Sequence, residues 1–147
     1  MSKFTDHLPK IAVIAFVVGG VAVLSTKFNG STAKTGSGTV SVSVPKDLSP
    51  TAQKGAKLFA DTCASCHGEN GSGSDKGPPL IHDIYNPGHH GDDSFYRAVR
   101  SGVQQHHWPY GNMPAQAKIN DQMVSDIVAY VREVQRANGI YYREHRM

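Results

Sequence analysis

The strongest constraint on how this chain can fold is a pair of cysteines with a histidine directly after the second. The segment reads Cys63-Ala64-Ser65-Cys66-His67. These are the two cysteines of a 147-residue chain, and a single pair this close cannot form a disulfide framework. On a helix the two thiols lie about one turn apart. The segment therefore gathers two sulfur nucleophiles and one metal-ligating ring in one place.

Several kinds of site use such a pair. A thioredoxin-like redox pair needs a strand–helix setting, which is not evident here. A structural zinc site needs four protein ligands, usually with a second pair downstream, and an ordinary disulfide leaves His67 unexplained. The segment is typical instead of c-type haem attachment, in which each thiol forms a thioether with a vinyl group and the histidine faces iron. We therefore favour one covalently bound haem at Cys63, Cys66 and His67.

Haem in an electron carrier normally has two axial ligands, and the candidates for the second are the four methionines of the chain. Met1 and Met147 are the chain ends, and Met123 belongs to an apolar helical stripe. Met113 follows Gly-Asn and precedes proline in a loop, so we expect it to be the sixth ligand. A thioether ligand favours ferrous iron. The alternative is that Met113 only fills a gap in the packing.

Five further histidines lie in the two loops that flank the expected haem: His82, His89, His90, His106 and His107. They are surface or loop-bonding residues in the simplest interpretation. In a second, one of them replaces the methionine as axial ligand. In a third, several from both loops bind copper or zinc, which both prefer imidazole ligands.

The N-terminal segment, residues 1–27, contains fourteen consecutive apolar residues at 11–24, preceded by Lys3 and Lys10. A cleaved signal peptide and an uncleaved anchor both fit this pattern. Residues 8–26 are long enough to cross a bilayer, and no clean cleavage site follows them. We therefore favour a membrane anchor with a cytoplasmic N-terminus and the remaining chain across the membrane.

Residues 28–48 are rich in Gly, Ser, Thr and Val and predict a flexible linker. Alternating residues at 39–44 favour a short strand as the alternative. The folded domain would then span 49–147. The net charge of +3 comes from residues 1–47, because residues 48–147 carry ten basic and ten acidic side chains. A neutral domain lacks the basic face that nucleic-acid binding needs.

Helical patterns dominate the domain, so the sequence predicts an all-α fold. Ser49-Pro50 forms an N-cap followed by proline at the first helical position, and a helix should continue through Cys66. A second helix is expected over 92–103. The last should begin after the cap Asn120 and end at Asn138-Gly139.

Residues 49 to about 137 resemble a class I cytochrome c domain. The matching stretches are GAKLFADTCASCHGENGSG (55–73), GPPL (77–80), GNMP (111–114) and VSDIVAYVREV (124–134). The resemblance implies three to five helices around covalent haem c, with Gly55 and Phe59 against Tyr130. It also implies that the Pro78 carbonyl, with Pro79 as the alternative, bonds the other ring nitrogen of His67 and that Leu80 packs on the haem.

With an anchor, the chain resembles membrane-attached monohaem cytochromes of bacterial respiratory chains. The resemblance implies a one-electron carrier rather than an enzyme, acting alone or as a subunit of an oxidoreductase complex. It places a single-pass protein in the inner membrane with its haem domain in the periplasm, between membrane electron-transfer complexes as donor and acceptor. Two alternatives stay open: a haem enzyme or sensor with a labile sixth ligand, and a copper-handling protein that uses the loop histidines.

Overall fold

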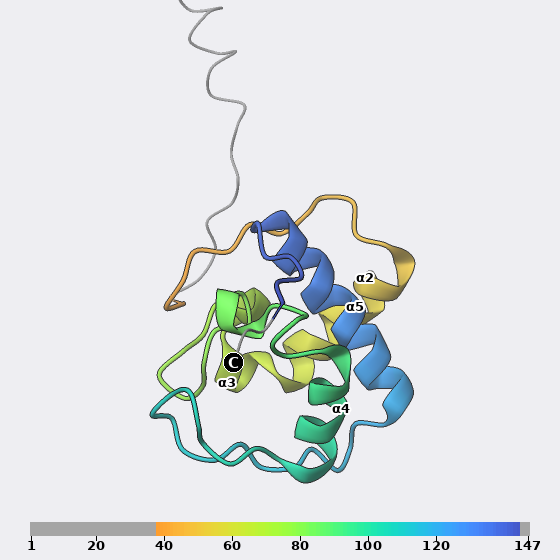
Figure 1. Cartoon of the computed structure of the whole chain (residues 1–147). Coiled ribbons are helices and arrows are strands. Elements are labelled where there is room, and N and C mark those ends of the chain that lie inside the picture. The colour runs from red at the N-terminus through yellow and green to blue at the C-terminus, as the bar shows by residue number, and fades with distance from the viewer. Residues whose placement is uncertain (1–37, 145–147) are drawn as a thin grey trace, which may run out of the picture. The chain divides into compact units, whose positions relative to one another are not determined.

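The computed structural model describes residues 38–144, and within them the fold is all-helical (Figure 1). The elements in chain order are α2 (Pro50–Thr62), α3 (Ala64–His67), η1 (Glu69–Gly71), η2 (Asp83–Tyr85), α4 (Asp92–Ser101) and α5 (Asp121–Ala137). In this part of the chain, β-pairing is limited to an isolated antiparallel bridge between Val103 and Met113. The predicted all-α class is confirmed.

The first helix begins where the sequence predicts. The Ser49 hydroxyl oxygen accepts a hydrogen bond from the Ala52 amide at 3.2 Å, and Pro50 occupies the first helical position. A continuous helix through Cys66 was expected, but α2 ends at Thr62 and the short α3 follows after Cys63. The cysteine–histidine segment therefore has a helical turn of its own.

Helices α2 and α5 pack against each other, shown in yellow and blue in Figure 1. A Cβ atom at Gly55 would overlap the backbone carbonyl of Asp126, so the two helices approach more closely than any other residue at position 55 would allow. The rings of Phe59 and Tyr130 lie beside this contact, 5.7 Å apart between centroids. Both side chains are buried. The packing implied by the family resemblance is therefore present.

The last helix has the predicted ends. The Asn120 side chain accepts from the Met123 amide at 3.0 Å, and α5 stops at Ala137, before Gly139 with its φ of +77°. The apolar stripe of α5 supplies much of the core, whose buried members are Ala52, Phe59, Ile81, Ile127, Tyr130, Val131, Val134 and Ile140.

Helix α4 ends at Ser101, earlier than the expected Val103. Gly102 has a φ of +75°, a left-handed conformation that stops the helix. Its position also lets the chain pass close to Met113, because a Cβ there would lie 2.5 Å from the Met113 carbonyl oxygen. Val103 then pairs with Met113 through two backbone hydrogen bonds of 2.9 Å, which close the loop between them.

The expected anchor at residues 8–26 lies outside the described residues, and so does the first part of the expected linker, residues 28–37. Among residues 38–144, no helix combines the length and the apolar character that crossing a bilayer requires. Residues 38–48 contact the domain: the Val40 amide donates to the Ser72 carbonyl at 3.0 Å, and Ser43 exchanges two hydrogen bonds with the Asn138 side chain. No strand forms in these residues. The predicted domain boundaries stay predictions.

Candidate haem-attachment site

Cys66 lies in α3 and Cys63 directly precedes it, and both are free thiols. Cys63 is partly buried and Cys66 is exposed. Burial raises the pKa of the Cys63 thiol to about 11, and the neighbouring Cys66 acts in the same direction. Neither sulfur is taken up by a disulfide, so both are available for the thioether bonds expected from the sequence.

His67 is held in one orientation by the loop that follows it. Its Nδ1 lies 2.9 Å from the carbonyl oxygen of Pro78. Because a carbonyl can only accept, Nδ1 carries the hydrogen and Nε2 keeps a lone pair. Burial lowers the pKa of His67, which the Pro78 hydrogen bond partly opposes. The ring is therefore a neutral imidazole with one nitrogen ready for a metal.

Pro78 reaches this position because the turn before it is fastened to the end of α3. The Gly73 amide donates to the His67 carbonyl at 2.6 Å, and the Ser74 hydroxyl donates to the Cys66 carbonyl at 2.6 Å. These bonds satisfy carbonyls that a helix end leaves unpaired. A Cβ at Gly77 would lie 2.9 Å from the Cys66 carbonyl oxygen, so the turn is also in close contact with the helix.

Leu80 is partly buried and packs against the core. Its backbone is fixed on both sides, since its amide donates to Gly71 at 2.8 Å and its carbonyl accepts from the Gln135 side chain at 2.9 Å. Met113 is also partly buried, and its backbone is held by the pairing with Val103. The roles of Leu80 and Met113 towards a haem stay predictions.

Trp108 supplies a second sign that the chain is shaped for a bound group. Its Nε1 is buried and makes no hydrogen bond of normal geometry. It lies near the Tyr85 hydroxyl. Burial raises the pKa of Tyr85 to about 12, the interaction with Trp108 opposes this rise, and Tyr110 adds to it. A buried donor without a partner is costly. Haem carries carboxylates that can accept such a bond, so the residues present fit this cofactor.

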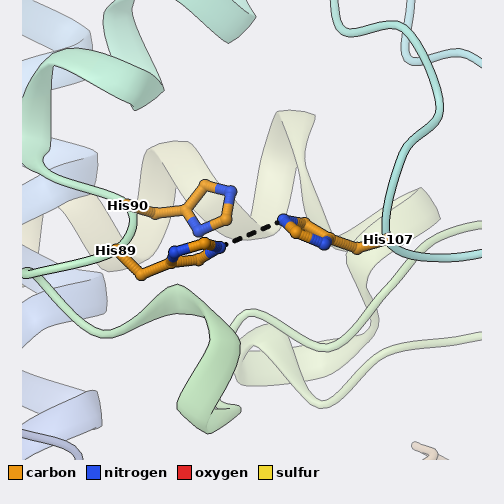
Figure 2. A group of neighbouring side chains, drawn as sticks. All are labelled: His89, His90 and His107. Carbon is orange, nitrogen blue, oxygen red and sulfur yellow. Dashed lines mark hydrogen bonds between the residues drawn. The ribbon is translucent and has the colours of Figure 1, made fainter. Parts of the chain in front are cut away.

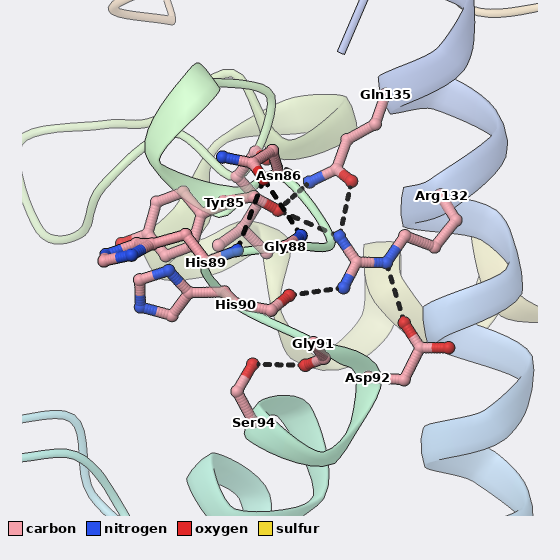
Figure 3. Close-up of polar contacts among 11 residues, drawn as sticks. Tyr85, Asn86, Gly88, His89, His90, Gly91, Asp92, Ser94, Arg132 and Gln135 are labelled. Atoms are coloured by element: carbon pink, nitrogen blue, oxygen red, sulfur yellow. Dashed lines mark hydrogen bonds and ion pairs between the residues drawn. The ribbon is translucent and has the colours of Figure 1, made fainter. Parts of the chain in front are cut away.

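A polar network around the buried Arg132, which the sequence did not predict, fixes the loop after Leu80 (Figure 3). Arg132 of α5 donates to the carbonyl of Tyr85 at 2.9 Å, to the carbonyl of His90, and to the carboxylate of Asp92 at 2.8 Å. Gln135 joins it at 2.7 Å. The only signal in the sequence is that two polar residues adjoin the apolar stripe of α5. This network holds the backbone that carries His89 and His90.

The structure separates the five loop histidines by role. His82 caps η2, because its Nδ1 accepts from the Ile84 amide at 3.2 Å, and its ring meets Trp108 edge-on. His106 is exposed and its Nδ1 bonds the Gln104 carbonyl at 2.8 Å. The other three, His89, His90 and His107, gather in one cluster.

A helical fold with two free thiols and an oriented imidazole on one turn defines a protein that attaches haem covalently. The family model described as Cytochrome c matches residues 52–135, more than half of the chain, and the chain belongs to this family. It therefore binds one haem c covalently. No curated protein and no solved structure matches the chain.

Proposed function

We propose that the chain is a one-electron carrier and not an enzyme. The observation that carries this proposal is the hydrogen bond between His67 Nδ1 and the Pro78 carbonyl, 2.9 Å long. A fixed imidazole with its Nε2 lone pair available is the ligand that a low-spin haem carrier requires. The cytochrome c family supplies the general role in electron transfer.

Each site residue has a distinct part in this proposal. Cys63 and Cys66 would retain the haem through thioether bonds, and His67 and Met113 would be the two protein ligands of its iron. The bound haem would supply the one-electron exchange, and a thioether ligand would raise the potential relative to two histidines.

Pro78 and Leu80 act around these ligands. The Pro78 carbonyl keeps the proton of His67 on Nδ1, which raises the basicity of Nε2. Leu80, next to the core, adds an apolar surface that excludes water from the cofactor. A low local dielectric favours the less charged state of the iron site, so these two residues would help to set the potential.

We further propose a bacterial respiratory setting. Residues 8–26 would anchor the chain in the inner membrane, with the haem domain in the periplasm. Membrane electron-transfer complexes would be the donor and acceptor. The apolar run and its flanking lysines support the anchor. Because residues 48–147 carry ten basic and ten acidic side chains, the two haem propionates make the domain mildly acidic, which favours partners with a basic docking face.

The optical spectrum of the full-length holoprotein tests the carrier proposal. A sulfur-ligated ferric haem has a weak band near the red end of the visible spectrum. We expect this band in the oxidised protein, and we expect it to persist when cyanide is added at low concentration. A Met113→Ala variant should lose the band and bind cyanide readily.

The same experiment separates the carrier from its main alternative. A haem enzyme or sensor with a labile sixth ligand would bind cyanide or carbon monoxide rapidly in the unaltered protein. If the Met113→Ala spectrum equals that of the unaltered protein, the sixth-ligand assignment is wrong. If the unaltered protein binds both ligands freely, the carrier proposal is wrong.

A further inference from the structure

Three imidazoles from two separate loops converge on one point of the domain. The ligand atoms of His89, His90 and His107 all lie within 4.8 Å of one another. The Nε2 atoms of His89 and His107 are 3.3 Å apart. Figure 2 shows the rings of His89 and His90 on one segment and that of His107 approaching from the opposite loop. This separation is within the span of two ligands of one metal ion.

The ring of His90 is already oriented as a metal ligand. Its Nδ1 lies 2.7 Å from the carbonyl oxygen of Ile84, so Nδ1 carries the hydrogen and Nε2 keeps the lone pair. Metal-ligating histidines usually have such a carbonyl partner on the other nitrogen, because it fixes the tautomer and raises the basicity of the ligand atom. The arrangement repeats the one between His67 and Pro78.

The backbone under this cluster is rigid. The buried Arg132 donates to the His90 carbonyl, and the amides of His89 and His90 both donate to the Asn86 carbonyl, at 3.1 and 2.9 Å. The Asn86 side chain accepts from the Gly88 amide at 2.9 Å. A site built on a backbone held in this way loses little entropy when a ligand binds.

Two of these imidazoles, His90 and His107, also favour the uncharged form that a metal needs. Burial lowers the pKa of His90, and so do the neighbouring imidazoles, against an opposing contribution from the Ile84 carbonyl. Burial and the imidazoles of His106 and His89 lower the pKa of His107. No acidic side chain is among the causes of either shift. The Nε2 atoms of His89 and His107 share a hydrogen bond, so one of them carries the hydrogen. A metal ion that binds both atoms would take the place of this hydrogen.

We propose that His89, His90 and His107 form a binding site for a divalent transition metal, Cu²⁺ or Zn²⁺, separate from the haem iron. Imidazole nitrogen is a preferred ligand of both ions. His107 is exposed, so water completes the coordination shell. The site is independent of the electron-carrier proposal, because it uses none of the residues assigned to the haem.

A metal ion at this point would tie together the two loops that precede α4 and follow it. His107 belongs to the loop that begins at Val103 and ends at Met113, and these two residues are already paired through their backbones. The ion would restrain the middle of that loop. Because binding is to the folded state alone, it should raise the melting temperature.

Metal titration of the full-length holoprotein tests the proposal. The protein is prepared without a polyhistidine tag, with its haem attached so that the cysteine sulfurs are occupied. Zn²⁺ and Cu²⁺ are each titrated by calorimetry in a buffer that does not bind metals. We expect one equivalent per chain in addition to iron, with Cu²⁺ bound more tightly, in keeping with the Irving–Williams order. The melting temperature should rise with added metal.

Variants identify the ligands. Loss of an outer hydrogen-bond partner weakens metal binding about 10–100-fold, so loss of a ligand should cost at least as much. We expect this loss in His107→Ala and in His89→Ala, together with loss of the metal-dependent rise in melting temperature. His106→Ala is the matched control. The exposed ring of His106 contacts that of His107, 4.2 Å apart between centroids, but His106 is not one of the three proposed ligands, so the variant should retain binding. An unchanged haem spectrum in each variant shows that it has folded.

Two results would overturn the site. The first is no saturable binding of either metal by the unaltered holoprotein. The second is binding that survives His107→Ala and His89→Ala, or that is lost in His106→Ala alone, since either pattern places the metal elsewhere.

Discussion

Arg132 of α5 is buried, yet its Nε donates to the exposed carboxylate of Asp92 at 2.8 Å, so that the last helix is bonded to the first residue of α4. The two partners differ sharply in exposure, at 8% for the arginine side chain and 61% for the aspartate. The arginine also donates hydrogen bonds to the carbonyls of Tyr85 and His90. The guanidinium therefore acts mainly as a buried hydrogen-bond donor to the backbone.

Replacing this arginine should strongly destabilise the domain. Arg132→Met keeps much of the apolar volume. It removes the arginine donor from the partly buried carbonyl of His90 and leaves the carbonyl of Tyr85 with the Gln135 side chain as its donor. The free energy of unfolding of the holoprotein should fall by about 2–4 kcal/mol, measured by denaturant titration. Arg100→Met is the control, because Arg100 pairs with Asp121 where both side chains are exposed, and it should leave the unfolding free energy nearly unchanged. Equal losses in the two variants would contradict a special role for burial.

The close approach of α2 and α5 predicts a second effect. Gly55→Ala places a methyl group against the carbonyl of Asp126, so the helices must separate and the unfolding free energy should fall by about 1–3 kcal/mol. Gly91→Ala is the comparison, because its Cβ would meet only the Pro87 carbonyl, at 3.7 Å. Thermal or denaturant unfolding of both variants checks this. A Gly55→Ala variant as stable as Gly91→Ala would show that the helices can adjust.

Gly102 predicts a coupling between backbone geometry and the expected sixth ligand. Gly102→Ala directs a methyl group at the Met113 carbonyl, whereas Gly111→Ala has a similar positive φ and no neighbour within 4 Å. Both variants carry the strain of a left-handed residue, but only Gly102→Ala should weaken the red band of the oxidised spectrum and speed cyanide binding. Equal spectra and equal rates of cyanide binding in the two variants would show that the Gly102 contact does not affect iron ligation.

Tyr130 should contribute a stability that disappears at alkaline pH. Burial raises its pKa to about 12, with a smaller contribution from Glu69, and its hydroxyl donates to the Asn70 side chain at 2.7 Å. An unfolded tyrosine ionises near pH 10. Between about pH 10 and 12 the unfolded chain therefore releases a proton that the folded chain retains, and stability falls as pH rises.

The Tyr130→Phe variant tests this dependence. It should lose about 1 kcal/mol at neutral pH with the hydrogen bond, and its stability should fall less steeply than that of the unaltered protein above pH 10. Tyrosinate absorbance, taken as the difference between the two proteins, should show one group titrating near pH 12. A difference spectrum that titrates near pH 10 would contradict the assignment.

Local chemistry made part of this structure predictable from the sequence. The caps Ser49 and Asn120 act within one helical turn, so their sequence neighbours suffice to identify them. The thiols and the imidazole of the attachment segment are likewise adjacent in the chain. The contact of Gly55 with α5 and the bond from His67 to Pro78 were expected only because the chain resembles a known family.

Long-range placement made the rest unpredictable. Arg132 looks like a polar residue beside an apolar stripe, and its partners are loop carbonyls that no periodic pattern identifies. Gly102 ends α4 two residues early because the chain must approach Met113, a contact that depends on the returning loop. The histidines of the two loops were recognised as candidates, but which of them meet depends on how the loops fold against each other.

Acid denaturation followed by extraction into organic solvent tests the central claim, that Cys63 and Cys66 bind haem covalently. The full-length protein is produced in cells with a haem-attachment system and purified. We predict that the colour stays with the polypeptide after extraction, and that a variant with both cysteines changed to serine yields no protein-bound colour. Complete transfer of haem from the unaltered protein into the organic phase, or purification of a colourless protein, would contradict the account.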